Sequence, residues 1–507
     1  MTPRPDWLEP LPDARQQRAI DEWAIQIRGI AGTTLMENAG AGLAALASVR
    51  APAGRVVVVC GKGNNGGDGL VVARLLREQG RDVDVLLLAP GEELSGDAKA
   101  NFDRLPGSAA RPFDPEALAG AAVIVDAILG TGFSGEPRDP ARTAIEAIND
   151  APGTPVIIAC DVPSGVDPST GEIAGAAVAA DATATFHAGK PGLWIAPGKD
   201  HAGDVTVVDI GIPPGAPGDP SLGLIAAAVL EQIPRRGRES TKFAAGSVLV
   251  CGGSLGLTGA PCLASEAAMR AGAGYVTACV PASLNVVFEQ RLLEVMTVAL
   301  PDAEGALLGD GADQVRERAE RSGALVLGPG LGRAEESGHL ARELARTVKI
   351  PLLLDADGLN AHAGRLDALA QRPAATVLTP HAGELARLLG TESAEIERHR
   401  LQAVRRAAET AQAVIVLKGD DTLVAEPGGR VGVSRGGASA LATAGTGDVL
   451  SGITGAFLAK GVEPFTAACA AVFLHARAGR LAGETIGTEG VIARDVIELL
   501  PRAHQER

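Results

Sequence analysis

One segment near the N-terminus limits the possible folds more than any other. Residues 55–60 form the run Arg-Val-Val-Val-Val-Cys, which is typical of a strand buried on both faces of a parallel sheet. Residues 61–69 follow directly, are rich in glycine and asparagine, and precede an amphipathic helix predicted for residues 70–78. This succession predicts a ligand-binding strand–loop–helix unit, although its spacing is not that of the usual dinucleotide fingerprint.

Strands and helices alternate through the rest of the first half. Residues 12–48 have helical spacing, and a further helix is expected at 141–148. Further strands are expected at 83–88, 122–126, 155–160, 182–186 and 205–210. Glycine-rich polar loops at 126–136, 161–167 and 187–193 follow three of them, and ligands of open parallel sheets bind at the carboxyl ends of the strands. The pattern predicts an α/β fold with a Rossmann-like three-layer parallel sheet.

A proline- and glycine-rich stretch at 211–220 has the composition of a linker. We therefore expect two domains, 1–215 and 216–507. The second half begins its own sheet at 246–251, and polar loops are expected at the ends of its strands. These loops are 252–254, 328–332, 355–360, 379–384 and 418–422. Their concentration on strand ends predicts a second α/β domain with its own site.

Residues 444–452, Ala-Gly-Thr-Gly-Asp-Val-Leu-Ser-Gly, are typical of an anion-binding loop at a helix start. Gly445 and Gly447 leave backbone N–H groups free to approach a phosphate, and the helix dipole favours negative charge there. Asp448 lies in the first turn. It either serves as a base or only stabilises the helix start, as acidic residues do in many helices.

Composition excludes several classes of partner and compartment. The net charge of −15 argues against a nucleic-acid or acidic-membrane surface. Six scattered cysteines lack metal-ligand spacing, which indicates reduced core thiols and a cytoplasmic protein. No apolar segment is long enough to be a membrane span or resembles a signal peptide. We expect a homo-oligomer without nucleic-acid or membrane partners.

Three side chains at strand ends of the first half are candidates for a cation site: Asn65, Asp126 and Ser164. They offer only oxygen ligands and one certain negative charge, which suits a hard monovalent cation better than zinc. Lys190 follows another strand end and is either a ligand-facing cation or a surface lysine.

The motifs together resemble a known family. The second half is similar to the ribokinase-like, ADP-dependent NAD(P)H-hydrate dehydratases through residues 328–332, 355–360, 379–384 and 444–452. The first half resembles NAD(P)H-hydrate epimerases through residues 36–40, 64–69, 126–132, 161–167 and 190–193. Both halves in one chain resemble the bifunctional nicotinamide-nucleotide-hydrate repair enzymes.

The resemblance implies roles in the first half. Asn65, Asp126 and Ser164 would bind potassium (K+), and Asp161 would transfer a proton as the carbon–oxygen bond at ring carbon six opens. Asp161 could instead cap a turn before Pro163. The implied substrate-binding residues are Asn64, Asn65, Gly66, Gly67, Asp68, Gly130, Thr131, Gly132, Phe133, Ser134, Gly135, Glu136 and Asp161.

In the second half, the resemblance places the hydrates NADHX and NADPHX near Ala260, Gly330, His381 and Asp448. Asp448 would take the proton of the substrate hydroxyl, which attacks ADP that is bound with magnesium (Mg2+). AMP and phosphate would be the by-products. A structural role for His381 stays open. The implied nucleotide-binding residues are Lys418, Gly419, Asp420, Asp421, Thr422, Gly445, Thr446 and Gly447.

Two alternatives remain at this point. The same loop and aspartate would serve a small-molecule kinase, because any hydroxyl acceptor can use them. The first half could also be a non-catalytic nucleotide-binding module, although intact Asn65, Asp126 and Asp161 argue against a loss of function.

Overall fold

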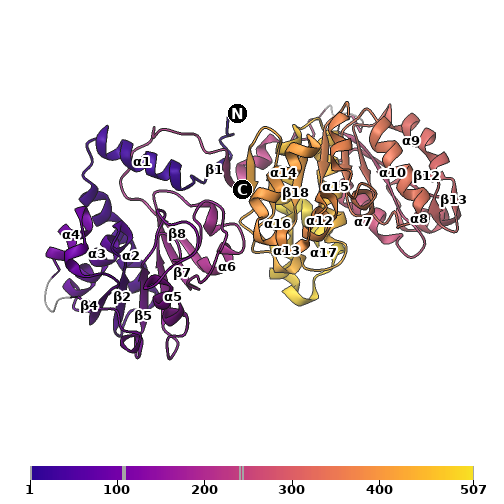
Figure 1. The fold of residues 1–507 in the computed structure, drawn as a ribbon. Helices are drawn as coiled ribbons and strands as arrows, with labels where there is room; N and C mark the ends of the chain where they lie inside the picture. Colours follow the sequence, from indigo (N-terminus) through magenta and orange to yellow (C-terminus); the bar gives the residue numbers. More distant parts are fainter. Residues whose placement is uncertain (1–2, 106–109, 239–240, 243–244, 506–507) are drawn as a thin grey trace. The chain divides into compact units, whose positions relative to one another are not determined.

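The computed structural model describes residues 3–105, 110–238, 241–242 and 245–505 (Figure 1). Internal contacts divide the chain into two units. One is Pro10–Gly223, and the other combines the chain before Pro10 with Leu224–Arg507. The proline- and glycine-rich stretch at 211–220 thus stays with the first unit. Strand β1 (Leu8–Pro10) belongs to the sheet of the second unit.

The first unit contains a seven-stranded sheet among its described residues, with the order β4-β3-β2-β5-β6-β7-β8. Every neighbouring pair is parallel, which confirms the predicted Rossmann-like sheet. The chain leaves β2 for β3 on one side and later enters β5 on the other side. The strands are β2 (Val56–Cys60), β3 (Val83–Leu87), β4 (Arg111–Pro112), β5 (Val123–Ala127), β6 (Val156–Cys160), β7 (Ala182–Phe186) and β8 (Asp204–Val208).

Helices cover both faces of this sheet. Val56 and Val58 belong to a core shared with α1 (Ala14–Gln26), α2 (Gly32–Arg50) and α3 (Asn64–Glu78). Val57 and Val59 point to the opposite face and pack with α5 (Ala141–Asn149). Alternate strand residues therefore supply two cores, which confirms the three-layer prediction. Helix α4 (Gly96–Asp103) packs on α3.

The start of α3 corrects one sequence prediction. The helix begins at Asn64 rather than at Leu70, so most of the expected glycine loop is helical. A Cβ on Gly66 would lie 1.9 Å from the Gly61 carbonyl oxygen, and one on Gly69 would lie 2.9 Å from Cys60 Sγ. These glycines allow the helix to pack closely on β2, and that packing offsets their low helix propensity.

The second unit has an eleven-stranded sheet among the residues described there, in the order β1-β9-β20-β19-β18-β17-β16-β15-β10-β11-β12. The run from β18 to β12 is parallel, whereas β18, β19 and β20 pair antiparallel. Its other strands are β9 (Leu222–Ile225), β10 (Ser247–Cys251), β11 (Tyr275–Pro281), β12 (Met296–Leu300), β15 (Ala324–Leu327), β16 (Leu352–Leu354), β17 (Thr376–Leu378), β18 (Val414–Leu417), β19 (Leu423–Ala425) and β20 (Val431–Val433).

Alternate residues of this sheet share one core chiefly with α7 (Gly259–Arg270), α15 (Thr446–Ala459), α16 (Pro464–Ile486) and α17 (Ala493–Gln505). Helix α15 packs on α7 and on β10, β15 and β16, so its N-terminus is held at the carboxyl ends of the strands. The other α-helices and strands described for this unit are α8 (Asn285–Arg291), α9 (Ala312–Ala319), α10 (Glu335–Thr347), α11 (Asp357–Asn360), α12 (Ala382–Leu389), α13 (Ser393–Arg398), α14 (Arg400–Ala411), β13 (Asp302–Ala303) and β14 (Ala306–Leu307). Helix α6 (Gly198–Ala202) belongs to the first unit.

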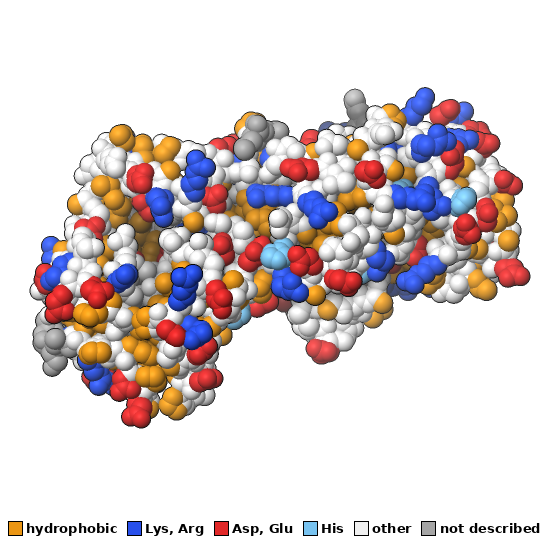
Figure 2. Space-filling model, in the orientation of Figure 1, with side chains coloured by type: hydrophobic (Ala, Val, Ile, Leu, Met, Phe, Trp, Pro, Cys, Tyr) orange, Lys and Arg blue, Asp and Glu red, His pale blue; other side chains and the backbone are white. Residues whose placement is uncertain are grey.

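Three general expectations can be compared with this fold. All six cysteines are buried and free, which confirms the prediction of reduced core thiols. Within the described ranges, no helix combines the length and apolar character that a membrane crossing requires. Acidic and basic side chains are interspersed over the face shown in Figure 2, without a continuous basic stripe among its coloured residues.

Candidate active sites

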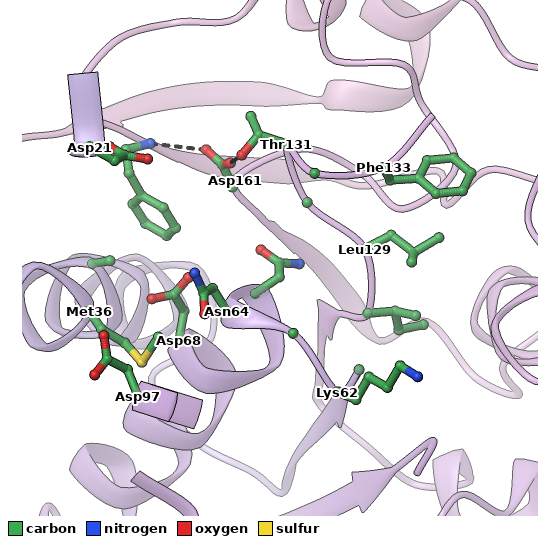
Figure 3. Close-up of a pocket in the computed structure, with 18 of the residues that line it drawn as sticks. Asp21, Met36, Lys62, Asn64, Asp68, Asp97, Leu129, Thr131, Phe133 and Asp161 are labelled. Atoms are coloured by element: carbon green, nitrogen blue, oxygen red, sulfur yellow. Dashed lines mark hydrogen bonds between the residues drawn. The ribbon is translucent and has the colours of Figure 1, made fainter. Parts of the chain in front are cut away.

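A cavity of about 880 Å³ opens in the first unit at the carboxyl ends of its strands (Figure 3). Loops after β2, β3, β5, β6 and β7 contribute to its lining, together with one face of α1. This is where the strand order reverses between β2 and β5, the usual ligand position in such sheets. The predicted substrate residues that line it are Asn64, Asn65, Asp68, Gly130, Thr131, Gly132, Phe133 and Asp161.

Asp161 is the most constrained side chain of this cavity. It follows β6 with a φ of 67°, in the left-handed region that aspartate tolerates better than most residues. Its Oδ1 accepts hydrogen bonds from Lys190 Nζ at 2.7 Å, from Thr185 Oγ1 at 3.1 Å and from the Phe186 amide at 3.3 Å. Its Oδ2 accepts one from Thr131 Oγ1 at 3.0 Å. Oδ1 is therefore saturated, while Oδ2 retains accepting capacity.

Opposing effects set the pKa of Asp161. Burial raises this pKa, but the charge of Lys190 and the hydrogen bonds lower it by a larger amount, so the net shift is downward. Two other acids of the cavity behave differently. Burial, together with the charges of Asp161 and Asp21, raises the pKa of Asp68 well above its usual range. Burial also raises the pKa of Asp21 on α1. The pKa of Asp161 is thus lowered, whereas the pKa values of Asp68 and Asp21 in the same cavity are raised.

Of the three candidate cation ligands, Asn65 lines this cavity, whereas Asp126 and Ser164 lie outside its lining. Asp126 is fully buried and accepts hydrogen bonds from Ser164 Oγ at 2.6 Å, the Ser164 amide at 2.8 Å and the Ile128 amide at 3.2 Å. Burial raises the pKa of Asp126 to about 6, because these bonds only partly offset it. Asn65 Oδ1 lies against Gly130, since a Cβ built there would be 2.8 Å from it. The structure therefore brings Asp126 and Ser164 into contact and places Asn65 in the first turn of α3, beside Gly130.

The second site forms around the N-terminus of α15. Gly445, the residue before the helix, has a φ of 92°, which only glycine adopts readily. A Cβ on Gly447 would lie 3.7 Å from Lys418 Nζ, so this lysine reaches the first turn of the helix. Both residues border a cavity of about 330 Å³, which is also lined by Gly419, Asp420, Thr422 and Thr446. Helix N-terminus and lysine together form a site for anionic groups.

Asp448 carries the strongest pKa shift of this site. Burial and the charge of Asp355 raise its pKa to about 7, although Lys418 lowers it. Asp355 is itself held by Lys418 Nζ at 3.1 Å and by Ser451 Oγ at 2.8 Å. Burial lowers the pKa of Lys418, but Asp355 and Glu384 raise it by more, so the lysine stays charged. Asp448 therefore titrates near neutral pH, as a general base should.

The structure places the expected hydrate-binding residues of this half in different surroundings. A Cβ on Gly330 would lie 3.2 Å from the Cβ of Ala260, so these two positions adjoin. His381 is 55% exposed. Its Nδ1 accepts a hydrogen bond from the Gly383 amide at 3.0 Å, which caps α12. The capping bond supports the structural role, and the exposed ring also leaves Nε2 accessible.

Comparison with known proteins agrees with this arrangement. Residues 248–502 match a family model described as NAD(P)H-hydrate dehydratase, and residues 32–192 match one described as YjeF-related protein N-terminus. A bifunctional NAD(P)H-hydrate repair enzyme of Salinibacter ruber is 41% identical over 98% of this chain and 96% of its own length. A bifunctional NAD(P)H-hydrate repair enzyme of Moorella thermoacetica is 39% identical over 96% of this chain and 95% of its own length.

The chain belongs to the bifunctional NAD(P)H-hydrate repair enzymes.

A crystal structure of an ADP/ATP-dependent NAD(P)H-hydrate dehydratase from Bacillus subtilis, co-crystallised with ATP and Mg2+, is 30% identical to this repair enzyme. The match covers 54% of this chain and 94% of the Bacillus subtilis protein, with a TM-score of 0.48.

Some residues predicted from the sequence lie away from the cavities of this repair enzyme. Gly66 and Gly67 pack against Gly61 and Met36. Ser134, Gly135 and Glu136 lie outside the lining of the first cavity, and the Glu136 side chain lies beside Gly175. Asp421 forms a buried ion pair with Arg400 at 2.8 Å. Asp420 instead borders the second cavity and accepts a hydrogen bond from the Gly437 amide at 2.8 Å.

Other residues of the sites had no assigned role in the sequence. Lys190 is 1% exposed and donates to Asp161, Thr185 and the Phe186 carbonyl, so it is not a surface lysine. Asp355 begins the motif at residues 355–360, so its place in the second site could have been predicted from the sequence. His475 on α16 had no signal, yet it lines the second cavity with its Nε2 buried and unpaired among the described residues. Gln17 and Asp21 lie in the stretch 12–48, for which helical spacing was predicted but no role in a site.

Proposed function

We propose that the cavity of the first unit interconverts the R and S forms of NADHX and NADPHX. The second site would convert the S form to NADH or NADPH at the expense of ADP. The observation that carries this assignment is that the pKa values of two aspartates are shifted in opposite directions. The pKa of Asp161 is lowered beside Lys190, whereas that of Asp448 is raised to about 7 beside an anion-binding helix start. Different proton-transfer tasks require different acid strengths.

The first reaction inverts a carbon that carries both a hydroxyl group and a ring nitrogen. Such a carbon loses its configuration when either bond opens. An ionised carboxylate accepts the hydroxyl proton and opens the carbon–nitrogen bond, and a protonated carboxyl donates to the oxygen and opens the carbon–oxygen bond. The lowered pKa of Asp161 favours the first route, in which Oδ2 accepts the proton because Oδ1 is occupied by Lys190, Thr185 and the Phe186 amide. Closing the bond from the other face gives the epimer.

The surroundings of Asp126 suit a potassium ion. Asp126 is a fully buried carboxyl without an ion-pair partner in the described part of the chain, and its neighbours Asn65 and Ser164 supply neutral oxygens. Neighbouring Asn65 Nδ2 is buried and unpaired within the same described ranges, so this amide is not committed to a protein partner. When bound, K+ would neutralise Asp126 and order the loops that carry Leu129 and Ser164 beside Asn65.

The second reaction makes hydroxide a better leaving group by phosphorylating it. Asp448 accepts the hydroxyl proton of the hydrate while that oxygen attacks the terminal phosphorus of ADP, and the bond to AMP breaks. Backbone N–H groups at Gly445–Gly447 and the Lys418 ammonium stabilise the charge on the transferred phosphoryl group. The ring nitrogen then expels phosphate, and loss of a ring proton restores the dihydronicotinamide. The balance is hydrate and ADP to NAD(P)H, AMP and phosphate.

Magnesium belongs to the nucleotide in this proposal. Asp355 and Asp448 are carboxylates close to the anion site, but Asp355 is already bound by Lys418, Thr379 and Ser451. The donor set therefore suits an ion that is held chiefly by phosphate oxygens and water, as Mg2+ usually is. Its contribution when bound would be to neutralise phosphate charge.

Two assays separate the proposed activities. Without ADP, an NADHX sample enriched in one epimer should equilibrate faster with protein than without it, as followed by proton NMR. With ADP and Mg2+, each NADH formed should be matched by one AMP and one phosphate. A stable phosphorylated product in place of NADH would instead identify a small-molecule kinase.

A further inference from the structure

One face of α1 forms a wall of the cavity in the first unit. Residues 14, 17, 18, 21, 22 and 25 all line it, which is the spacing of a single helical face. The helix precedes residues 32–192, which match the family model. The recognised motifs therefore account for none of this wall.

Gln17 is the buried polar residue at the centre of this face. Its side chain is 4% exposed, and its Nε2 donates a hydrogen bond to Asp21 Oδ1 at 2.9 Å. Its Oε1 is buried and has no hydrogen-bond partner among the described residues. Buried acceptors in native proteins are nearly always paired. An unpaired acceptor on a cavity wall indicates a ligand that donates a hydrogen bond there.

Asp21 locates this acceptor relative to the reacting atoms. The charges of Lys190 and Asp161 both influence Asp21, so this part of α1 lies close to the catalytic pair. Figure 3 shows Asp21 on the same side of the pocket as Asp161 and Thr131, with Lys62 across from them. Gln17, which also lines the cavity and is bonded to Asp21, therefore lies on the part of the wall close to Asp161 and Lys190, where the proposed mechanism puts the hydrate ring.

The hydrate ring has one good donor of this kind besides its hydroxyl. That donor is the NH2 of the ring carboxamide. We propose that Gln17 Oε1 accepts a hydrogen bond from this carboxamide and that Gln17 makes the site selective for an amide over a carboxylate. An acid ring offers no N–H to Gln17 and would set its carboxylate oxygens against the unpaired Gln17 oxygen. The inference rests on the proposed epimerisation and assigns its substrate recognition.

The test compares epimerisation kinetics of NADHX with those of the hydrate of reduced nicotinate adenine dinucleotide. Gln17→Met keeps the size of the side chain and removes its acceptor. We expect KM for NADHX to rise about three- to tenfold, the effect of one neutral hydrogen bond, with kcat changed less than twofold. The preference of the wild type for the amide over the acid should shrink by a similar factor.

Two controls separate recognition from folding. Gln26→Met places the same substitution at an exposed position of α1 and should leave both parameters unchanged. ADP-dependent conversion of S-NADHX by the Gln17→Met protein reports on the second unit and should persist. An unchanged KM with an active wild type overturns the inference, and so does a loss confined to kcat. An inactive wild type overturns the proposed epimerisation itself.

Discussion

Lys190 Nζ lies 2.7 Å from Asp161 Oδ1, with the two side chains only 1% and 9% exposed. Lys190 also donates to Thr185 Oγ1 at 3.0 Å and to the Phe186 carbonyl at 2.8 Å, so its three N–H bonds are used. The ammonium group is thereby fixed on one oxygen of the carboxylate. It supplies the charge that lowers the pKa of a buried acid, while the other oxygen accepts a bond only from Thr131 among the described residues.

Replacing Lys190 by methionine should move the acid limb of the epimerisation profile to higher pH. Burial would then dominate and raise the pKa of Asp161, so the ionised fraction would fall at mildly acidic pH. The rate at pH 6 should drop more than the rate at pH 8. Lys62→Met, at an exposed lysine of the same cavity, is the matched control. An equal loss at both pH values would contradict this role.

The same pair should contribute to stability in a defined pH range. The folded pKa of Asp161 is lowered, so its contribution is present above its ordinary pKa of 3.8 and is lost as pH falls through the folded value. Breaking a buried pair by removing one partner costs about 3–5 kcal/mol. Chemical unfolding of Lys190→Met at pH 7 should show a loss of this order, which narrows at acidic pH. A constant difference at every pH would point to packing alone.

Dehydration should gain activity as pH rises through about 7, the pKa of Asp448, because the base must be ionised. Asp355→Asn removes a negative charge that raises this pKa, so the rising limb should move to lower pH. The measurement is kcat/KM for S-NADHX with saturating ADP. An unshifted limb in Asp355→Asn would show that another group titrates.

Asp448→Asn should also change stability with the opposite sign to Lys190→Met. The raised folded pKa means that the contribution of Asp448 to stability is fully present below 3.8 and is lost as pH rises through about 7. The asparagine side chain of the variant cannot ionise, so the variant does not lose this stability as pH rises. Thermal unfolding of the second unit should therefore show Asp448→Asn as the more stable protein at pH 8 and nearly equal to the wild type at pH 4.

Two glycines of the anion site should respond differently to alanine. Gly445 has a φ of 92°, and its Cβ would lie 2.6 Å from Leu263 Cδ1, so Gly445→Ala should destabilise the second unit by about 1–3 kcal/mol. At Gly447 the nearest atom is Lys418 Nζ at 3.7 Å, an ordinary contact. Gly447→Ala should fold normally and raise KM for ADP. Equal losses of stability would contradict this geometry.

Potassium should stabilise the first unit if Asp126 and Ser164 help to bind it. The midpoint of thermal unfolding should rise with K+ concentration relative to tetramethylammonium at the same ionic strength. Ser164→Ala should weaken the response, and Asp126→Asn should abolish it, because the buried negative charge is lost. A response that survives in Asp126→Asn would place the ion elsewhere.

Strand positions and strand-end loops were predictable because buried parallel strands are continuous apolar runs, and glycine-rich loops mark their ends. The start of α3 was not predictable, since Asn64–Gly69 has low helix propensity and only its packing against Gly61 and Cys60 makes it helical. Asp161 and Asp448 were identified from motifs. Lys190, Gln17 and His475 were not assigned, because one lysine, glutamine or histidine has no periodic signal. Their importance comes from contacts with distant residues.

One measurement tests the central claim most directly: the recovery of dihydronicotinamide absorbance from an R and S mixture of NADHX with ADP, Mg2+ and K+. The account predicts complete recovery by the wild type and none by Asp448→Asn. Asp161→Asn should recover the S share quickly and then slow to the uncatalysed rate of epimer exchange. No recovery by the wild type, or complete fast recovery by Asp161→Asn, would contradict the account.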